Sequence, residues 1–103
     1  MVTVMPEPLT PDHFQPHVGK LFRVQGTHHA FTLAHIDSRR REDWEHEMGL
    51  REPFNLIFRG PAGDVMREGL YVLEAEDGSS FELYIIPIHT PARDRQDYQA
   101  AFN

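Results

Sequence analysis

Large apolar side chains recur at every second position in five separate segments of this chain, and that alternation restricts the possible folds more than any other feature. The alternating residues are Phe22/Val24, Phe31/Leu33, Phe54/Leu56/Phe58, Phe81/Leu83/Ile85 and, around Ala100, Tyr98/Phe102. Successive side chains of a β-strand point to opposite faces, so a period of two places all these large groups on one face. The chain is therefore predicted to consist mainly of strands that bury one face.

Six strands are predicted, over residues 20–25, 29–36, 53–59, 69–76, 80–88 and 97–103. Asp77-Gly78 predicts a hairpin because glycine tolerates the positive φ that such turns require. The segment GPAGD at 60–64 is rich in turn-forming residues. Short antiparallel strands joined by short turns predict an all-β fold, a compact antiparallel barrel or sandwich of about six strands.

One short helix is predicted before the first strand. Thr10 is a suitable N-cap, Pro11 suits the first helical position, and Pro16 should end the helix after about one turn. The expected packing residues of this segment are Leu9, Phe14 and Val18. We divide the chain into an N-terminal arm (1–8) and a single β domain (9–103), because 103 residues fit one domain. In the long connection 37–52, Trp44 and Met48 are four residues apart, a spacing that is compatible with a short helix there.

The sequence carries 16 acidic and 10 basic residues, a formal net charge of −6. Nucleic-acid affinity depends on clustered lysine and arginine, so this charge argues against a nucleic-acid partner. Three arginines at 39–41 precede acidic residues, and we interpret them as a solvated surface segment. Without cysteine, disulfides, thiol catalysis and thiolate zinc sites are excluded. No signal peptide or membrane-spanning run is recognisable, so we expect a soluble, cytoplasmic protein without a membrane partner.

Seven histidines raise the question of a metal site. His13 and His17 have the spacing of one helix face, but Pro16 lies between them and disrupts that geometry. His28 and His29 are adjacent, and neighbours in a strand point to opposite faces. No H-x-H or H-E-x-x-H pattern occurs. We therefore predict exposed histidines, with no metal site and no cofactor.

Catalytic motifs are also missing from the sequence. None of the three serines stands in a G-x-S-x-G elbow, and GPAG at 60–63 lacks the lysine and helix of a phosphate-binding loop. Glu74, Glu76 and Asp77 cluster at a predicted hairpin tip, where solvent keeps carboxyl pKa values ordinary. The protein is therefore not expected to be an enzyme.

Two features are candidates for interaction. Arg59 has the opposite parity to its apolar neighbours, so we predict an outward side chain that pairs with a carboxylate and supports the Gly60-Pro61 loop. The alternative is that Arg59 binds a partner or a ligand. In the fifth strand, Tyr84, Ile86 and Ile88 make the second face apolar as well. The favoured cover for that face is the segment 9–18, and the alternative is another chain.

Four segments form a set: FNLIFRGP at 54–61, GLY at 69–71, IPI at 86–88 and YQAAFN at 98–103. Together they resemble the domain-of-unknown-function family 6916, whose members read approximately F-x-L-x-F-R-G-P, Q-G-x-Y, a strand ending in proline, and Y-x-A-x-F-N. The resemblance covers residues 9–103, with Glu68 where the family tends to have glutamine. This small bacterial family has no assigned activity, so the resemblance implies no catalytic residue. It implies an association with phage-tail-collar and tail-fibre-like proteins.

The predicted function is a non-enzymatic structural or protein-interaction module, a monomer or weak homo-oligomer. An accessory role in a phage-tail-like or tail-fibre assembly is the more specific hypothesis. The alternative is a small-ligand-binding barrel or weak enzyme, with a pocket lined by Tyr71, Tyr84, Arg59 and histidines. A deep pocket with convergent polar groups would favour this alternative, and a filled core with a flat apolar patch would favour the module.

Overall fold

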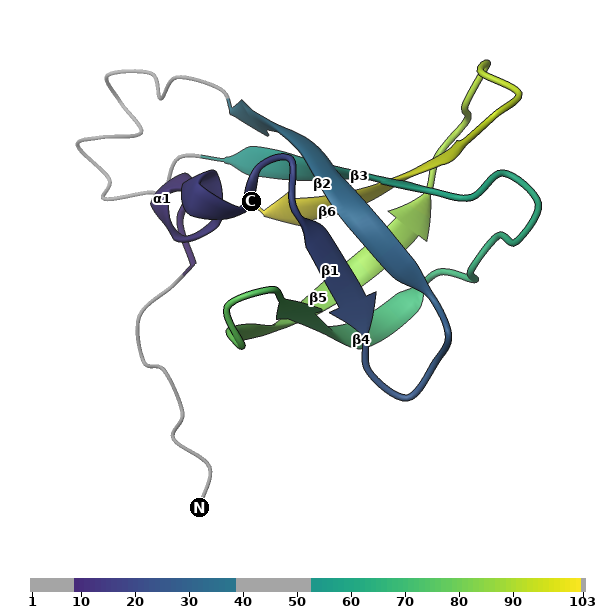
Figure 1. The fold of residues 1–103 in the computed structure, drawn as a ribbon. Helices are drawn as coiled ribbons and strands as arrows, with labels where there is room; N and C mark the ends of the chain where they lie inside the picture. Colours follow the sequence, from purple (N-terminus) through teal and green to yellow (C-terminus); the bar gives the residue numbers. More distant parts are fainter. Residues whose placement is uncertain (1–8, 39–52, 103) are drawn as a thin grey trace.

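The computed structural model of the protein describes residues 9–38 and 53–102. These residues form a short α-helix, a 3₁₀ turn and six strands (Figure 1). The elements are α1 (Pro11–Phe14), η1 (Gln15–His17), β1 (Leu21–Val24), β2 (Ala30–Ser38), β3 (Phe54–Gly60), β4 (Gly69–Ala75), β5 (Ser80–Pro87) and β6 (Gln96–Phe102). All six predicted strands are present, and their ends differ from the prediction by at most two residues.

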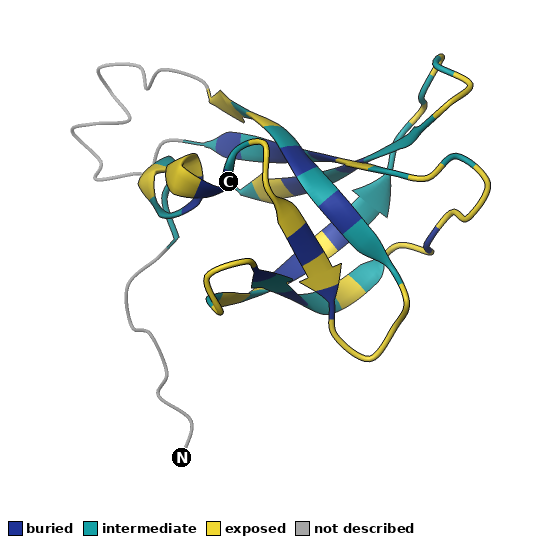
Figure 2. Ribbon diagram, viewed as in Figure 1, coloured by how far each residue is buried: buried dark blue, intermediate teal, exposed yellow. Residues whose placement is uncertain are grey.

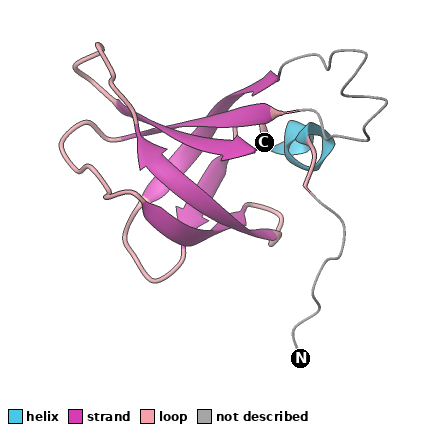
Figure 3. Ribbon diagram, turned by 180° about the vertical axis from the view of Figure 1, so that it is seen from behind, coloured by secondary structure: helices cyan, strands magenta, loops and turns pink. Residues whose placement is uncertain are grey.

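The six strands close into an antiparallel barrel in the order β1-β2-β3-β6-β5-β4, with β4 paired to β1 (Figures 1 and 3). Two three-stranded meanders, β1–β2–β3 and β4–β5–β6, are joined where β3 pairs with β6 and β1 with β4. The all-β prediction is confirmed, and of the two architectures it left open the protein adopts the barrel. Closure pairs the strands that would otherwise be free sheet edges.

Side chains alternate between the barrel interior and the surface along most strands, as Figure 2 shows. The interior is filled by buried apolar groups. Six of the largest fully buried side chains are aromatic: Tyr98, Phe14, Phe22, Phe31, Phe54 and Phe58. The residues that alternate in the sequence are all buried here, except that Phe81 and Phe102 are partly buried and pack against the core. The predicted buried faces are thus confirmed.

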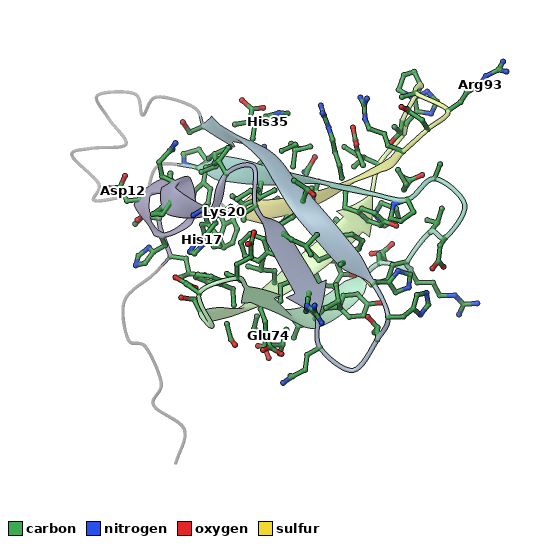
Figure 4. The ribbon with its side chains drawn as sticks, viewed as in Figure 1. Asp12, His17, Lys20, His35, Glu74 and Arg93 are labelled. Carbon is green, nitrogen blue, oxygen red and sulfur yellow. The ribbon has the colours of Figure 1, made fainter. Side chains whose placement is uncertain are left out.

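A β-bulge in β2 interrupts this alternation. The register against β3 shifts between Leu33 and His35, so Ala34 is the extra residue. Beyond the bulge, Ile36 packs against the core, although regular alternation from Leu33 would turn it outward. The neighbouring His35 is exposed on the outer surface (Figure 4).

The helical segment closes one end of the barrel. The Phe14 ring lies 4.7 Å from that of Phe81 and 5.8 Å from that of Phe102, between ring centroids. Leu9 and Val18 pack against the same core, as predicted. The α-helix ends at Phe14 after about one turn, as predicted, and a 3₁₀ turn then continues through Pro16 to His17. Proline is compatible with the start of such a turn, where its missing N–H would have no partner.

This position contradicts the cover that we predicted for the second face of the fifth strand. The helical segment contacts Phe81, which belongs to the inner face of β5, and so seals the barrel end. Tyr84, on the outer face of the same strand, stays 50% exposed. The helical segment lies at the barrel end because its Phe14 is fully buried there against the rings of Phe54, Phe81 and Phe102.

The connection from β3 to β4 closes the opposite end. Its Met66 is buried, and the Met66 backbone N–H donates a 2.9 Å hydrogen bond to the hydroxyl of the fully buried Tyr98. The Tyr71 hydroxyl donates to the Arg67 carbonyl at 2.8 Å. Hydrogen bonds to two tyrosine side chains, Tyr98 and Tyr71, therefore hold this connection against the barrel.

Some predictions lie outside the described residues. These are the N-terminal arm 1–8, the possible helix around Trp44 and Met48, and the arginines at 39–41. Among the residues that the structure does describe, no helix is long and apolar enough to cross a membrane.

Candidate functional site

Arg59 lies near the end of β3, directly opposite Asp97 of β6. The two form an ion pair with 3.8 Å between Nε and Oδ1, and Arg95 Nε donates to the same oxygen at 3.0 Å. The Asp97 N–H donates to the hydroxyl of Thr90 at 2.9 Å. The predicted outward orientation and carboxylate partner of Arg59 are found. The ion pair ties β3 to β6 beside the loop between β5 and β6, whose Arg93 points away from the barrel (Figure 4).

Tyr84 lies on the outer surface of β5, opposite Leu70 of β4. These two side chains are 50% and 60% exposed. The Tyr84 hydroxyl donates a 2.6 Å hydrogen bond to Glu68, which raises the tyrosine pKa because the nearby carboxylate opposes ionisation. Ile86 follows on the same face and is half-buried opposite Gln99. We call Leu70, Tyr84 and Ile86 the outer apolar patch.

Ile88 lies beyond β5 and is half-buried, and its backbone N–H bonds to the Asp97 carbonyl at 3.1 Å. It belongs to the β5–β6 connection and extends the row that Tyr84 and Ile86 begin. Sequence reasoning missed Leu70. Which residue of the predicted strand 69–76 lies opposite Tyr84 depends on the number of residues in the hairpin loop. The sequence alone does not give that number, so it did not identify Leu70 as the partner of Tyr84.

A polar cluster joins two connections at the end of the barrel that Met66 closes. The His28 Nε2 donates a hydrogen bond to Asp64 Oδ2, and His29 Nδ1 lies 3.9 Å from the same oxygen. The two imidazoles stack, with 4.3 Å between ring centroids. The three groups offer ligand atoms that all lie within 4.8 Å of one another. We call His28, His29 and Asp64 the histidine–aspartate cluster.

The turn before the histidines is fixed by its own hydrogen bonds. Gly26 has a φ of +78°, a conformation that glycine adopts without steric penalty. The Thr27 hydroxyl donates to the Val24 carbonyl at 2.9 Å and accepts from the His29 N–H at 3.0 Å. The Thr27 N–H bonds to the Val24 carbonyl as well. The His29 side chain is only 12% exposed, whereas that of His28 is 75% exposed.

These positions overturn the argument that separated the two histidines. His29 precedes β2 and His28 lies in the turn, so the alternation of strand side chains does not apply to them. The sequence pattern marks Asp64 only as part of a turn. Its carboxyl accepts the hydrogen bond from His28, which lowers the pKa of Asp64 below its ordinary value of 3.8.

The two histidines of the helical segment, His13 and His17, do not form a cluster with each other. His13 Nδ1 accepts a 2.9 Å hydrogen bond from the Thr10 backbone N–H at the start of α1. His17 is buried against Phe22 and Phe81, and its Nε2 lies 3.9 Å from Asp77 Oδ2. Both imidazoles thus stabilise the helical segment that closes the barrel end, His13 by a hydrogen bond and His17 by packing.

The pocket of the alternative hypothesis is not assembled from its predicted residues. Tyr71 bonds to Arg67, Tyr84 bonds to Glu68, and Arg59 pairs with Asp97. An open surface hollow of about 300 Å³ does border the cluster histidines. Its lining residues are Leu21, Arg23, Thr27, His28, His29 and Ala30.

Comparisons with known proteins give one match. Neither the curated proteins nor the solved structures contain a significant match to this chain. A family model described as a domain of unknown function (DUF6916) matches residues 9–102, which include all six strands and the helical segment. The chain therefore belongs to the DUF6916 family.

Proposed function

We propose that this domain is a non-enzymatic protein-interaction module that binds its partner through the outer apolar patch. The observation that carries the proposal is the cross-strand pair of Leu70 and Tyr84, which are 60% and 50% exposed on the outside of the barrel. Contiguous apolar side chains exposed on a surface mark interaction sites. Tyrosine is also enriched among the residues that contribute most to binding energy.

The barrel interior is filled by side chains, which supports an interaction module over a barrel that binds a small ligand inside. Small-ligand sites are concave and leave space for the ligand. In this barrel the inner faces of the strands meet around fully buried rings such as Phe22, Phe31 and Phe58. One end is closed by Phe14 and the other by Met66. Recognition is then left to the outer surface.

The charges around the patch indicate the chemistry of the partner. Glu68 accepts the hydrogen bond from Tyr84, and Glu82 lies two residues before Tyr84 on the same exposed face of β5. The whole sequence has a net charge of −6. A protein surface with an apolar contact flanked by arginine or lysine would complement this arrangement, because opposite charges at the rim speed association and select the partner.

A component of a phage-tail-like or tail-fibre assembly is the specific partner class that we propose. Its support is the family resemblance of the motif-bearing segments, because the patch itself selects only the chemistry of a partner surface.

Site-specific photo-crosslinking in the source cell tests this proposal. A photoreactive phenylalanine analogue at position 70 should give a discrete crosslinked protein, identified by mass spectrometry. The same analogue at His35 should not give that product, because His35 is exposed on β2, across the barrel from the patch. Equal products from both positions would contradict the assignment of the patch, and a product of this chain with itself would identify a homo-oligomer.

The identified partner then allows a quantitative test. Leu70→Ser and Tyr84→Ala should each weaken binding at least about tenfold, a loss typical of central contact residues. Leu21→Ser is the matched control, because Leu21 is 40% exposed on β1, outside the patch. If Leu21→Ser weakens binding as much as Leu70→Ser, another surface carries the interaction.

A further inference from the structure

We propose that the histidine–aspartate cluster binds a late first-row divalent metal ion such as Zn²⁺. The three residues offer ligand atoms that all lie within 4.8 Å of one another. His28 Nε2 and His29 Nδ1 are the imidazole nitrogens that face Asp64 Oδ2. Two imidazole nitrogens and one carboxylate oxygen form a donor set that suits zinc and its neighbours, whereas Mg²⁺ and Ca²⁺ prefer oxygen ligands alone.

The distances are close to those that coordination requires. Metal–ligand bonds of about 2.0–2.1 Å in a tetrahedral site place neighbouring ligand atoms roughly 3.3 Å apart. His29 Nδ1 and Asp64 Oδ2 are 3.9 Å apart, so this pair needs to close by only a small side-chain rotation. The His28 ring must tilt out of its stack on His29 and give up its hydrogen bond to Asp64. Its side chain is 75% exposed, and little around it opposes that motion.

The backbone on both sides of the cluster is already held. On one side, Thr27 bonds to the Val24 carbonyl and to the His29 N–H. On the other side, Asp64 stands two residues before Met66, whose N–H bonds to the buried Tyr98 hydroxyl. A metal site needs supported ligands to reach useful affinity, because ordering a loose loop would oppose binding.

The core connects these two supports. The Tyr98 ring stacks on Phe31 with 4.4 Å between centroids, and the His29 ring lies 6.2 Å from the same Phe31. His29 and Asp64 therefore extend from one packed unit, although they are far apart in the sequence. Three protein ligands leave at least one coordination position of a tetrahedral ion for water or a further ligand, and the exposure of His28 and Asp64 opens that position to solvent.

Calorimetric titration of the full chain, prepared without a histidine tag and stripped with a chelator, tests the site. Zn²⁺ should bind with one ion per chain, and Mg²⁺ should not bind. His28→Ala, His29→Ala and Asp64→Asn should each lower the Zn²⁺ affinity at least about tenfold. His35→Ala is the matched control and should leave the affinity unchanged. His35 is exposed on the outer face of β2 (Figure 4), whereas the cluster residues lie in the connections β1–β2 and β3–β4.

Two further measurements separate a lost ligand from a damaged fold. Each variant's far-UV circular dichroism and thermal midpoint are compared without metal. In the unaltered protein, Zn²⁺ should raise the thermal midpoint, because an ion that binds only the folded state stabilises it. It should also move the NMR amide signals of residues 26–30 and 63–66. The proposal is wrong if Asp64→Asn and the unaltered protein bind Zn²⁺ with equal affinity, or if His35→Ala removes the binding.

Discussion

Gly60 ends β3 at a point where two aromatic rings leave no space for a side chain. A Cβ at this position would lie 2.9 Å from Cδ1 of Phe31 and 3.3 Å from Cε1 of Tyr98. The sequence suggested a turn glycine, but Gly60 does not have a positive φ. Glycine is needed here because the stacked rings approach the backbone closely.

We predict that Gly60→Ala lowers the free energy of unfolding by about 1–3 kcal/mol, the usual penalty for overpacking a core. Chemical denaturation measures this loss. Gly63→Ala is the matched control, because nothing lies within 4 Å of a Cβ at position 63. It should change stability by less than about 0.5 kcal/mol. Equal effects from both substitutions would show that the Phe31–Tyr98 stack does not restrict position 60.

Tyr98 combines full burial with a polar group. Burial raises the pKa of its hydroxyl above the ordinary value of 10.0, because the ionised form would lose its hydration. In the unfolded chain the group keeps its ordinary pKa. The stability that its neutral form provides is therefore present below pH 10 and is lost as the pH rises from there toward the higher pKa of the folded state.

We therefore predict that the free energy of unfolding falls steeply above about pH 10, as chemical denaturation at a series of pH values would show. Tyr98→Phe should make this fall shallower. The same variant should lose about 1–3 kcal/mol at neutral pH, because the buried Met66 N–H loses its acceptor. A free energy of unfolding that stays constant well above pH 10 would contradict the burial of a neutral Tyr98 hydroxyl.

The segment formed by α1 and η1 is too short to be stable alone and depends on the core for its structure. Its main contact is Phe14, which is fully buried against Phe54, Phe81 and Phe102. Phe14 thus belongs to the same core as the strands. The segment acts as the closure of one barrel end.

Phe14→Ala should lower the free energy of unfolding by about 3–5 kcal/mol, the usual loss for a buried phenylalanine. The control is Gln15→Ala in the same segment, because Gln15 is exposed, and it should have little effect. Thermal and chemical denaturation of both variants measure the difference. A loss below about 1 kcal/mol for Phe14→Ala would mean that the barrel end does not need this closure.

The β4–β5 hairpin shows how one residue of loop length changes a surface. An Asp77-Gly78 loop of two residues would pair Tyr84 with Tyr71. The structure instead places Ala75 opposite Ser79, with Gly78 at a φ of +91°, and so pairs Tyr84 with Leu70. The outer apolar patch depends on this register.

In the whole molecule, closure of the barrel divides the surface into separate regions. The strands bury their inner faces, the helical segment seals one end, and the β3–β4 connection seals the other. The outer apolar patch lies on the β4–β5 side. The histidine–aspartate cluster lies where the connections β1–β2 and β3–β4 meet. Separate placement allows each proposal to be tested by substitutions that leave the other region intact.

Much of this architecture follows from local sequence. The alternation of residues such as Phe54, Leu56 and Phe58 reports a buried face, because the geometry of a strand fixes where neighbouring side chains point. The positive φ of Gly78 and the helix start at Thr10-Pro11 are equally local, since backbone sterics alone favour them. These signals depend on a few adjacent residues, and for that reason the strands, the hairpin and the helix could be predicted.

The remaining features depend on contacts between distant residues. Barrel closure requires β1 to pair with β4, and the inward turn of Ile36 requires a bulge against β3. Asp64 reaches His28 only because the barrel brings together two connections 36 residues apart. No local propensity encodes such approaches, because they result from packing the whole core. The alternating apolar residues thus determined which faces are buried, and the three-dimensional packing decided which polar groups meet on the surface.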